Sequence, residues 1–217
     1  MATNVYIDGF NLYYGALRGT PHKWLDLASL SQRLFPKHVI NRICYFTARV
    51  SALPHDPQVA ARQDVYLRAL RTIPTLTIYE GFFLSNPIHA PRWPLVYPPG
   101  LPPSGPPEMV QVLKTEEKGS DVNLATHLLW DACRGDFDEA VVMSNDSDLA
   151  EPIRVVVQEF GKPVTVVNPH FRRQPTRLLL KVASSTLRQI NRSALASSQF
   201  ASPLTDAKGA FTKPAGW

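Results

Sequence analysis

The chain has 217 residues, of which 44% are hydrophobic and 19% are charged, so it is long and apolar enough to bury the core of one ordinary domain. This composition excludes a fully disordered protein. No run approaches the roughly 18 consecutive apolar residues that span a bilayer, and the N-terminal segment lacks the basic and long apolar regions of a signal peptide. We therefore expect a soluble protein without a membrane partner.

The net charge of +5 is unevenly distributed along the chain. Residues 168–217 carry eight Lys or Arg against one acid, a net charge of +7, which leaves a net charge of −2 for residues 1–167. A basic segment beside a slightly acidic body can attract a polyanion, although a basic tail can also serve solubility alone.

Two cysteines, Cys44 and Cys133, lie in apolar runs far apart in the sequence and show no metal-ligand spacing. Buried free thiols are therefore a simpler reading than a disulfide or a zinc site. This use of cysteine is typical of a reducing compartment, and we expect a cytoplasmic protein.

Short β-rich runs alternate with longer helical patterns along the chain. In chain order the patterns predict a strand at 4–7, a helix at 26–35, a strand at 42–47, a helix at 57–72, a strand at 76–83, a helix at 120–134, a strand at 140–143, a helix at 148–160, a strand at 163–167 and a helix at 173–190. Strands that alternate with helices predict right-handed crossovers in a mainly parallel sheet with helices on both faces. The fold class is therefore α/β.

The helix at 120–134 has clear end signals. Ser120 can cap it, Asp121 lies in its first turn, and Gly135 follows its last apolar position.

Two segments interrupt the alternation. Nine of the 21 residues from Pro87 to Pro107 are proline, which predicts an extended loop, an insertion at about 85–109, rather than a helix or a central strand. Its Trp93 and Tyr97 could stack on a nucleic acid or only pack within a surface loop. Residues 193–217 show little apolar periodicity and predict a disordered tail.

Acidic side chains gather at the predicted carboxyl edge of the sheet, where open α/β sheets place their sites. Asp8 ends the first strand, Asp146 and Asp148 follow the strand at 140–143, and Asp121 opens a helix close behind Glu117. Asp121 and Asp148 could instead only cap helices, and Glu117 could lie in a solvated turn. Several carboxylates with no adjacent base favour a bound divalent cation, and oxygen ligands suit Mg²⁺ or Mn²⁺. Such a site predicts phosphodiester hydrolysis.

Three sequence blocks carry a family resemblance. Val5-Tyr-Ile-Asp-Gly-Phe-Asn11, Glu117-Lys-Gly-Ser-Asp-Val-Asn-Leu-Ala125 and Met143-Ser-Asn-Asp-Ser-Asp-Leu-Ala150 resemble, in order and spacing, the NYN domain, the LabA-like branch of the PIN-like ribonucleases. The resemblance implies a Rossmann-like three-layer α/β/α sandwich, a nuclease domain at 1–168, and a metal-dependent endoribonuclease site. Its acidic set corresponds to Asp8, Asp121, Asp146 and Asp148, and its polar supporting positions to Asn11 and Ser144. Asn145 departs from the family's usual glycine.

The functional prediction is therefore an endoribonuclease that uses a Mg²⁺- or Mn²⁺-activated water and has single-stranded RNA as its partner. The sequence leaves open whether the chain forms a homo-oligomer. Five basic residues of a predicted C-terminal helix, 169–192, would form one ridge that binds nucleic acid: Arg173, Arg177, Lys181, Arg188 and Arg192. The alternative is a non-catalytic module that binds RNA or protein. A haloacid-dehalogenase phosphatase is disfavoured because Phe10 stands where its second acid belongs.

Overall fold

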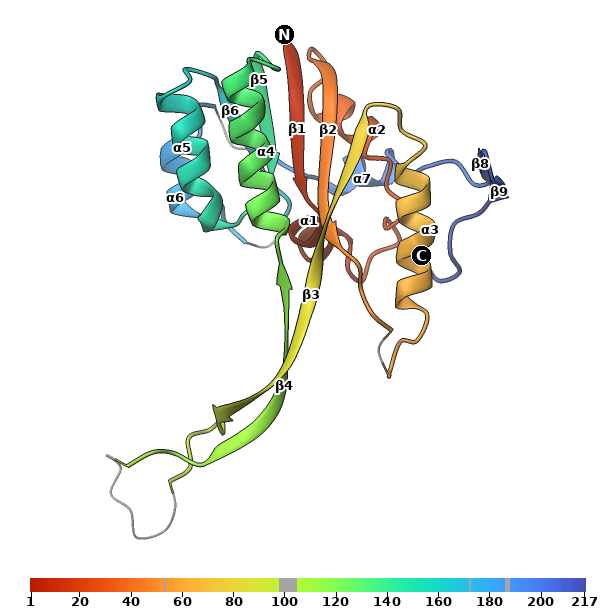
Figure 1. The fold of residues 1–217 in the computed structure, drawn as a ribbon. Coiled ribbons are helices and arrows are strands. Elements are labelled where there is room, and N and C mark those ends of the chain that lie inside the picture. The colour runs from red at the N-terminus through yellow and green to blue at the C-terminus, as the bar shows by residue number, and fades with distance from the viewer. Residues whose placement is uncertain (53, 98–104, 172, 186–187) are drawn as a thin grey trace.

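The structure, a computed structural model, describes residues 1–52, 54–97, 105–171, 173–185 and 188–217. A mainly parallel sheet runs through the body of the molecule, and helices cover both of its faces (Figure 1). This arrangement is a Rossmann-like three-layer α/β/α sandwich, so the predicted fold class is confirmed.

The sheet has the strand order β4-β3-β2-β1-β5-β6-β7. Its strands are β1 (Ala2–Asp8), β2 (Val39–Ala48), β3 (Leu76–Pro91), β4 (Met109–Lys118), β5 (Glu139–Met143), β6 (Val164–Asn168) and β7 (Arg188–Gln189). All neighbours pair in parallel except β3 and β4. Because β2 and β3 extend the sheet on one side of β1, and β5 and β6 on the other, the strand order reverses between β1 and β5. Open α/β sheets bind ligands at such a switch point.

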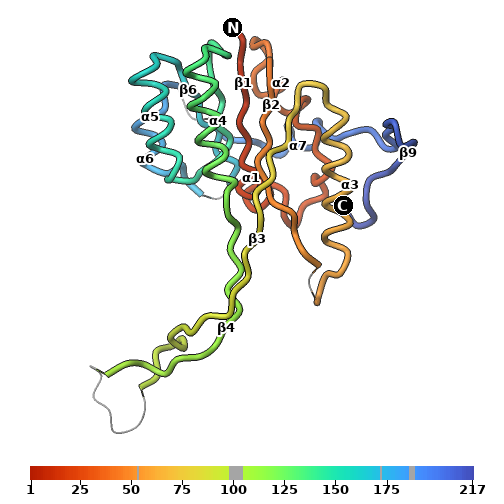
Figure 2. Tube along the Cα trace, in the orientation of Figure 1, coloured from red at the N-terminus to blue at the C-terminus, as the bar shows by residue number. Residues whose placement is uncertain are grey.

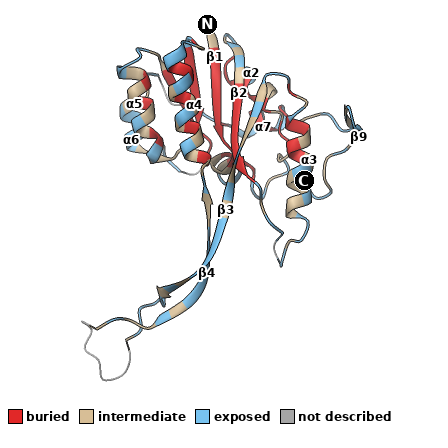
Figure 3. Ribbon diagram, viewed as in Figure 1, coloured by how far each residue is buried: buried red, intermediate tan, exposed pale blue. Residues whose placement is uncertain are grey.

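Two hydrophobic cores lie on opposite faces of the sheet. One contains α1 (Gly9–Leu12), the π-helical turn η1 (Tyr13–Leu17), α2 (Leu27–Leu34), α3 (Val59–Leu70) and α7 (Arg192–Ala196). The other contains α4 (Ser120–Arg134), the 3₁₀ turn η2 (Ser147–Leu149), α5 (Ala150–Gln158) and α6 (Arg177–Val182). Val5 and Ile7 of β1 belong to the first core and Tyr6 to the second, which is the two-residue period of a strand buried on both faces. The chain trace and the burial colouring show the same layers (Figures 2 and 3).

The proline-rich insertion differs from the predicted loop. β3 continues to Pro91 and pairs antiparallel with β4, so that a two-stranded ribbon projects from the body (Figure 1). We call its outer part, residues 84–91 paired with 109–116, the arm. Every second residue of a strand in such a ribbon directs its N–H away from the other strand, so prolines at Pro87 and Pro91 need not break the pairing. Of the predicted loop, residues 98–104 lie outside the described part.

The C-terminal quarter also differs from its prediction. In place of one helix at 173–190, α6 ends at Val182, because the next residues bond to the sheet: Ser184 donates its N–H to the Val164 carbonyl at 2.9 Å, and its hydroxyl accepts the Val164 N–H at 3.1 Å.

Residues 193–217, predicted as a disordered tail, include most of α7 and a hairpin of β8 (Leu204–Asp206) and β9 (Gly209–Phe211). Phe200 and Phe211 pack on the buried Trp24, with ring centroids 5.7 and 6.3 Å from it. These contacts join residues far apart in the sequence, so no local sequence pattern indicates them.

Cys44 is buried and Cys133 is exposed, and both are free thiols. The prediction of burial is therefore wrong for Cys133, which lies on the outer side of α4. Within the described residues, no helix is long and apolar enough to cross a membrane.

Candidate active site

Asp8 is the last residue of the central strand and is only 3% exposed. Gly9 begins α1 immediately afterwards, where a Cβ atom would lie 2.7 Å from the Phe46 carbonyl oxygen. Both Asp8 oxygens accept hydrogen bonds. Asn11 donates its backbone N–H to Oδ1 at 2.9 Å and its side-chain amide to Oδ2 at 2.7 Å, and the Ser144 hydroxyl donates to Oδ2 at 2.9 Å. The carboxylate is therefore held in one orientation.

Ser144 and Asn145 connect the end of β5 to the end of β1. The Ser144 hydroxyl, while donating to Asp8, accepts the N–H of Asp146 at 3.1 Å. The N–H of Asn145 donates to the side-chain oxygen of Asn11 at 3.3 Å. Asn11 and Ser144, the two supporting positions that the family resemblance implies, thus lie in the network that joins Asp8 to Asp146.

The start of α4 brings Glu117 and Asp121 to the same edge of the sheet. Gly119, with φ of 98°, makes the turn from β4 into the helix. Ser120 does not cap α4 as predicted. Its N–H and hydroxyl instead donate to Glu117 Oε1 at 3.0 and 2.8 Å. Glu117 therefore stabilises the turn that places Asp121.

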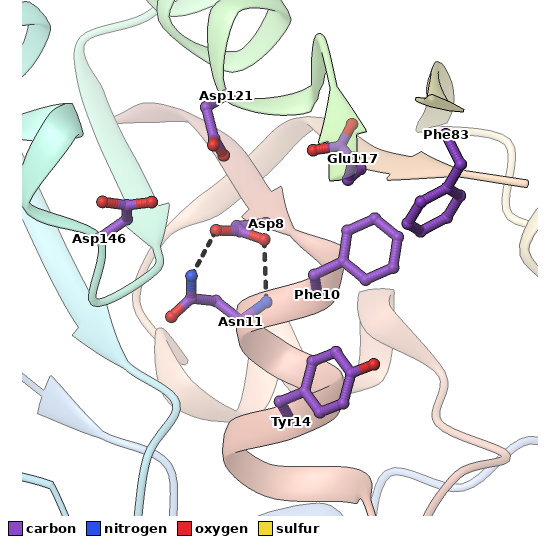
Figure 4. Close-up of a pocket in the computed structure, with 8 residues that line it drawn as sticks. All are labelled: Asp8, Phe10, Asn11, Tyr14, Phe83, Glu117, Asp121 and Asp146. Carbon is purple, nitrogen blue, oxygen red and sulfur yellow. Dashed lines mark hydrogen bonds between the residues drawn. The ribbon is translucent and has the colours of Figure 1, made fainter. Parts of the chain in front are cut away.

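These acids line one pocket of about 300 Å³ (Figure 4). We call the four acidic lining residues, Asp8, Glu117, Asp121 and Asp146, the acidic cluster. The remaining lining residues are Phe10, Asn11, Tyr14 and Phe83, so no Lys or Arg side chain of residues 1–52, 54–97, 105–171, 173–185 or 188–217 lines it. Asp148 is exposed and lies outside the lining, with its N–H bonded to Asp146 Oδ1 at 3.0 Å.

Burial and repulsion by neighbouring acids make ionisation of Asp8 and Asp121 costly. Burial raises the pKa of Asp8, although the hydrogen bonds from Asn11 and Ser144 oppose the rise. Burial, followed by the charges of Asp8, Asp146, Glu117 and Asp148, raises the pKa of Asp121 to about 6. A bound cation would relieve this repulsion.

The donor set fits a hard divalent cation. All of the acidic side chains offer oxygen, which suits Mg²⁺ or Mn²⁺. In the described part of the chain, no three His, Cys, Asp or Glu side chains are already arranged to hold an ion. Mg²⁺ normally binds one or two carboxylates and keeps several waters, so a preformed cage of protein ligands is not required. A shared ion at Asp8, Asp121 and Asp146 stays a prediction.

His170 and Thr176, which sequence reasoning did not assign to the site, lie beside it. His170 Nε2 is 3.1 Å from the side-chain oxygen of Asn11, to which it donates. Thr176 donates its N–H to the side-chain oxygen of Asn145 and its hydroxyl to the Asn145 carbonyl, each at 2.8 Å. No spacing in the sequence signals these contacts, because they join segments that meet only in the folded sheet.

The five basic residues predicted to form one ridge lie on separate elements. Arg173 lies in the loop before α6, Arg177 and Lys181 are on α6, and Arg192 begins α7 on the other face of the sheet. Arg188 begins β7, and its side chain is outside the described part. The single ridge is therefore wrong, because the helix it required does not continue past Val182.

Comparisons with known proteins place the chain in a family through one relative. No family model matches the chain. A crystal structure of a protein of unknown function from Vibrio parahaemolyticus is similar, with a TM-score of 0.53 and 17% identity over 88% of this chain and 93% of that one, which shows the fold. The chain is also 31% identical, over an alignment of 244 positions, to the 6-hydroxy-3-succinoylpyridine 3-monooxygenase HspA of Pseudomonas putida, covering 100% of this chain and 75% of that protein. At this level of identity over its full length, the chain belongs to the family of HspA.

Proposed function

We propose that the protein is a Mg²⁺- or Mn²⁺-dependent endoribonuclease that hydrolyses phosphodiester bonds in single-stranded RNA. The observation that carries the proposal is the acidic cluster: four carboxylates from β1, β4, α4 and the loop after β5 line one pocket, and none of the described residues that line it is basic. The resemblance of the three sequence blocks to the NYN domain supports the same chemistry.

Asp8, Asp121 and Asp146 would hold the cation, with Glu117 and Asp148 beside them. A divalent cation bound there would offset the charge of the scissile phosphate and lower the pKa of an attacking water. Asn11 and Ser144 keep both oxygens of Asp8 oriented throughout. Hydrolysis forms one bond from the water oxygen to phosphorus and breaks the bond to the leaving ribose oxygen, which takes a proton from the water.

Asp146→Asn tests the proposal against a matched control. Purified protein is incubated with labelled single-stranded and double-stranded RNA and DNA in Mg²⁺, Mn²⁺ or EDTA. We expect cleavage of single-stranded RNA that requires the metal, falls at least about 100-fold in Asp146→Asn, and persists in Asp138→Asn, whose acid lies at the opposite edge of the sheet and bonds the Ala2 N–H. EDTA-resistant cleavage that survives Asp146→Asn would contradict the proposal. Binding without cleavage would favour the non-catalytic alternative.

A second candidate function comes from the relative HspA, whose name describes a monooxygenase that acts on 6-hydroxy-3-succinoylpyridine. Monooxygenation transfers one atom of O₂ to the substrate and reduces the other to water with two electrons from a reductant, so it needs a cofactor or co-substrate for those electrons. Oxygen uptake with this compound and NADH or a reduced flavin distinguishes it from hydrolysis. Oxygen uptake that requires 6-hydroxy-3-succinoylpyridine, in a protein that shows no metal-dependent RNA cleavage, would support the monooxygenase function in place of the nuclease function.

A further inference from the structure

One side of the acidic pocket is aromatic. Phe10, Tyr14 and Phe83, which we call the aromatic wall, line the pocket together with the acidic cluster, and their rings lie on the side away from Asp146 (Figure 4). Phe10 comes from α1 and Phe83 from β3, and their rings meet edge to face with centroids 5.7 Å apart. The wall therefore joins elements from two distant parts of the chain beside the carboxylates.

The position of the wall follows from local spacing on both segments. Phe10, Tyr14 and Arg18 are four residues apart along α1 and the π-helical turn η1, so their side chains follow one side of this segment. Phe83 pairs with Glu117 across the ribbon, at the root of the arm. The same antiparallel pair thus supplies one aromatic and one acidic residue to the pocket.

The outer end of the wall is open to solvent and carries a positive charge. Tyr14 is 58% exposed, and the Arg18 guanidinium carbon lies 5.4 Å from the centroid of its ring. A pocket of about 300 Å³ corresponds to about ten waters at ~30 Å³ each, enough for a planar ring and a few waters. The pocket thus offers a carboxylate side for a cation, a neutral aromatic side, and a guanidinium at the rim.

The ligand that matches this order of groups is a nucleotide of a single strand. A planar base stacks on aromatic side chains, and the phosphates on either side of it are attracted to Arg18 and to a cation at the acidic cluster. We propose that the aromatic wall holds one unstacked base of the RNA next to the scissile phosphate, with Arg18 against the backbone. This inference rests on the proposed nuclease function.

The wall would select for single strands with little regard to sequence. A base inside a duplex is stacked on both faces and paired along one edge. Its faces therefore cannot reach Phe10 or Tyr14 without a cost of a few kcal/mol for unstacking and unpairing. Every base has an aromatic face, so stacking tolerates sequence changes.

Trp93, on the proline-rich segment, provides the control aromatic residue. It is 85% exposed and lies beyond the arm, which extends away from the body and from the pocket (Figure 1). Stacking at the aromatic wall predicts that Trp93 contributes nothing to binding of a short strand.

The test measures binding without cleavage. All proteins carry Asp146→Asn, and the probe is a 12-nucleotide single-stranded RNA in which one 2-aminopurine is moved along the strand, in Mg²⁺. Because the wall tolerates every base, the strand can bind in several registers, and we expect partial quenching of the 2-aminopurine at most internal positions. That quenching should be lost in Tyr14→Leu and Phe83→Leu, with a fall in affinity of about 5- to 100-fold for each variant. Tyr14→Phe should keep both properties, and Trp93→Leu should bind as the parent protein does.

A second arm needs no change in the wall. A strand of the same length in which every nucleotide is abasic should lose affinity by a similar factor on the parent protein and by little on Tyr14→Leu. Equal affinity for the intact and abasic strands, or competition by duplex RNA as strong as that by the single strand, would overturn the stacking proposal. Neither result depends on cleavage. Wild-type protein that binds and quenches the probe but cleaves no nucleic acid would refute the nuclease function separately.

Discussion

Asp8 and Asp121 differ in whether hydrogen bonds stabilise the charged form of the buried carboxylate. Asp8 accepts hydrogen bonds from Asn11 and Ser144, which stabilise its charged form against burial. For Asp121, burial and the four neighbouring acids all raise the pKa. A cation bound beside Asp121 would therefore oppose every contribution that raises its pKa.

The pH dependence of metal-free stability follows from Asp121. Its pKa rises from 3.8 to about 6 in the folded state, so the folded protein retains a proton that the unfolded chain releases between these pH values. Ionised Asp121 then disfavours folding above about pH 6, and the effect disappears below about pH 4. The side chain is half-exposed, so we expect about 1 kcal/mol after solvent screening rather than the full ~3 kcal/mol.

Urea unfolding of wild type and Asp121→Asn in EDTA measures this effect. At pH 7.5 the variant should be the more stable by about 1 kcal/mol, and at pH 4 the two should agree. With Mg²⁺ added the order should reverse, because only the wild type keeps the full ligand set. A variant that is less stable than wild type at pH 7.5 in EDTA would show that Asp121 stabilises the fold by its contacts instead.

At the scale of elements, the close approach of β3 to the start of α4 fixes the acidic side of the pocket. A Cβ atom on Gly81 would lie 2.5 Å from the Lys118 carbonyl oxygen, 2.6 Å from Glu117 Oε1 and 3.1 Å from the Ser120 nitrogen. The first two distances are too short for any side chain. Only glycine lets the turn that carries Glu117 and Asp121 rest against the sheet.

Gly81→Ala should therefore lower stability by about 1–3 kcal/mol and displace Glu117 from the pocket. We expect weaker Mg²⁺ binding in calorimetry together with the loss of stability in urea. Ser85→Ala, at an exposed position of the same strand, is the control and should change stability by less than about 0.5 kcal/mol. Unaltered metal binding in a destabilised Gly81→Ala protein would mean that Glu117 does not influence the ion.

The arm is expected to be dispensable for folding of the body. Its apolar residues include Leu84 and Leu113, which are 44% and 71% exposed, so it buries little there. Asn86 and Lys114 are register partners, and an Asn-Gly turn between them can replace residues 87–113. We expect the melting temperature to change by less than about 2 °C. A larger fall would show that the arm packs on the body or on a second copy of the chain.

The sequence predicted the elements with local signals and missed those that depend on distant partners. The strands ending at Asp8 and Met143 were found because buried parallel strands are nearly continuous apolar runs. Asp8 and Asp146 were found because they lie at or just after the ends of such strands, and Asp121 because it opens a helix with clear end signals. The arm was missed because prolines argue against a central strand but not against a ribbon. The aromatic wall was missed because Phe10 and Phe83 are far apart in the sequence and their rings meet only in the folded protein.

At the scale of the whole molecule, charge is arranged around the pocket rather than along one helix. The acids line the floor, and Arg173 and Arg177 flank the segment that Thr176 ties to Asn145. Both arginines are exposed. We expect a strand that leaves the pocket beside Asn145 to pass these two arginines.

The salt dependence of RNA binding distinguishes Arg173 and Arg177 from basic residues elsewhere on the protein. Each phosphate contact that is lost should flatten the plot of log affinity against log salt by about 0.7 for a single strand, so Arg173→Gln with Arg177→Gln should reduce the slope by about 1.4. Arg134 is equally exposed but lies at the other end of α4, about 20 Å from Asp121. Arg134→Gln should leave the slope unchanged. The affinity for the 12-nucleotide RNA is measured from about 50 to about 300 mM salt for the wild type, the double variant and Arg134→Gln. An unchanged slope in the double variant would place the strand on another path. A fall in Arg134→Gln about half as large as that in the double variant, in proportion to the charges removed, would mean that RNA is attracted only by net charge.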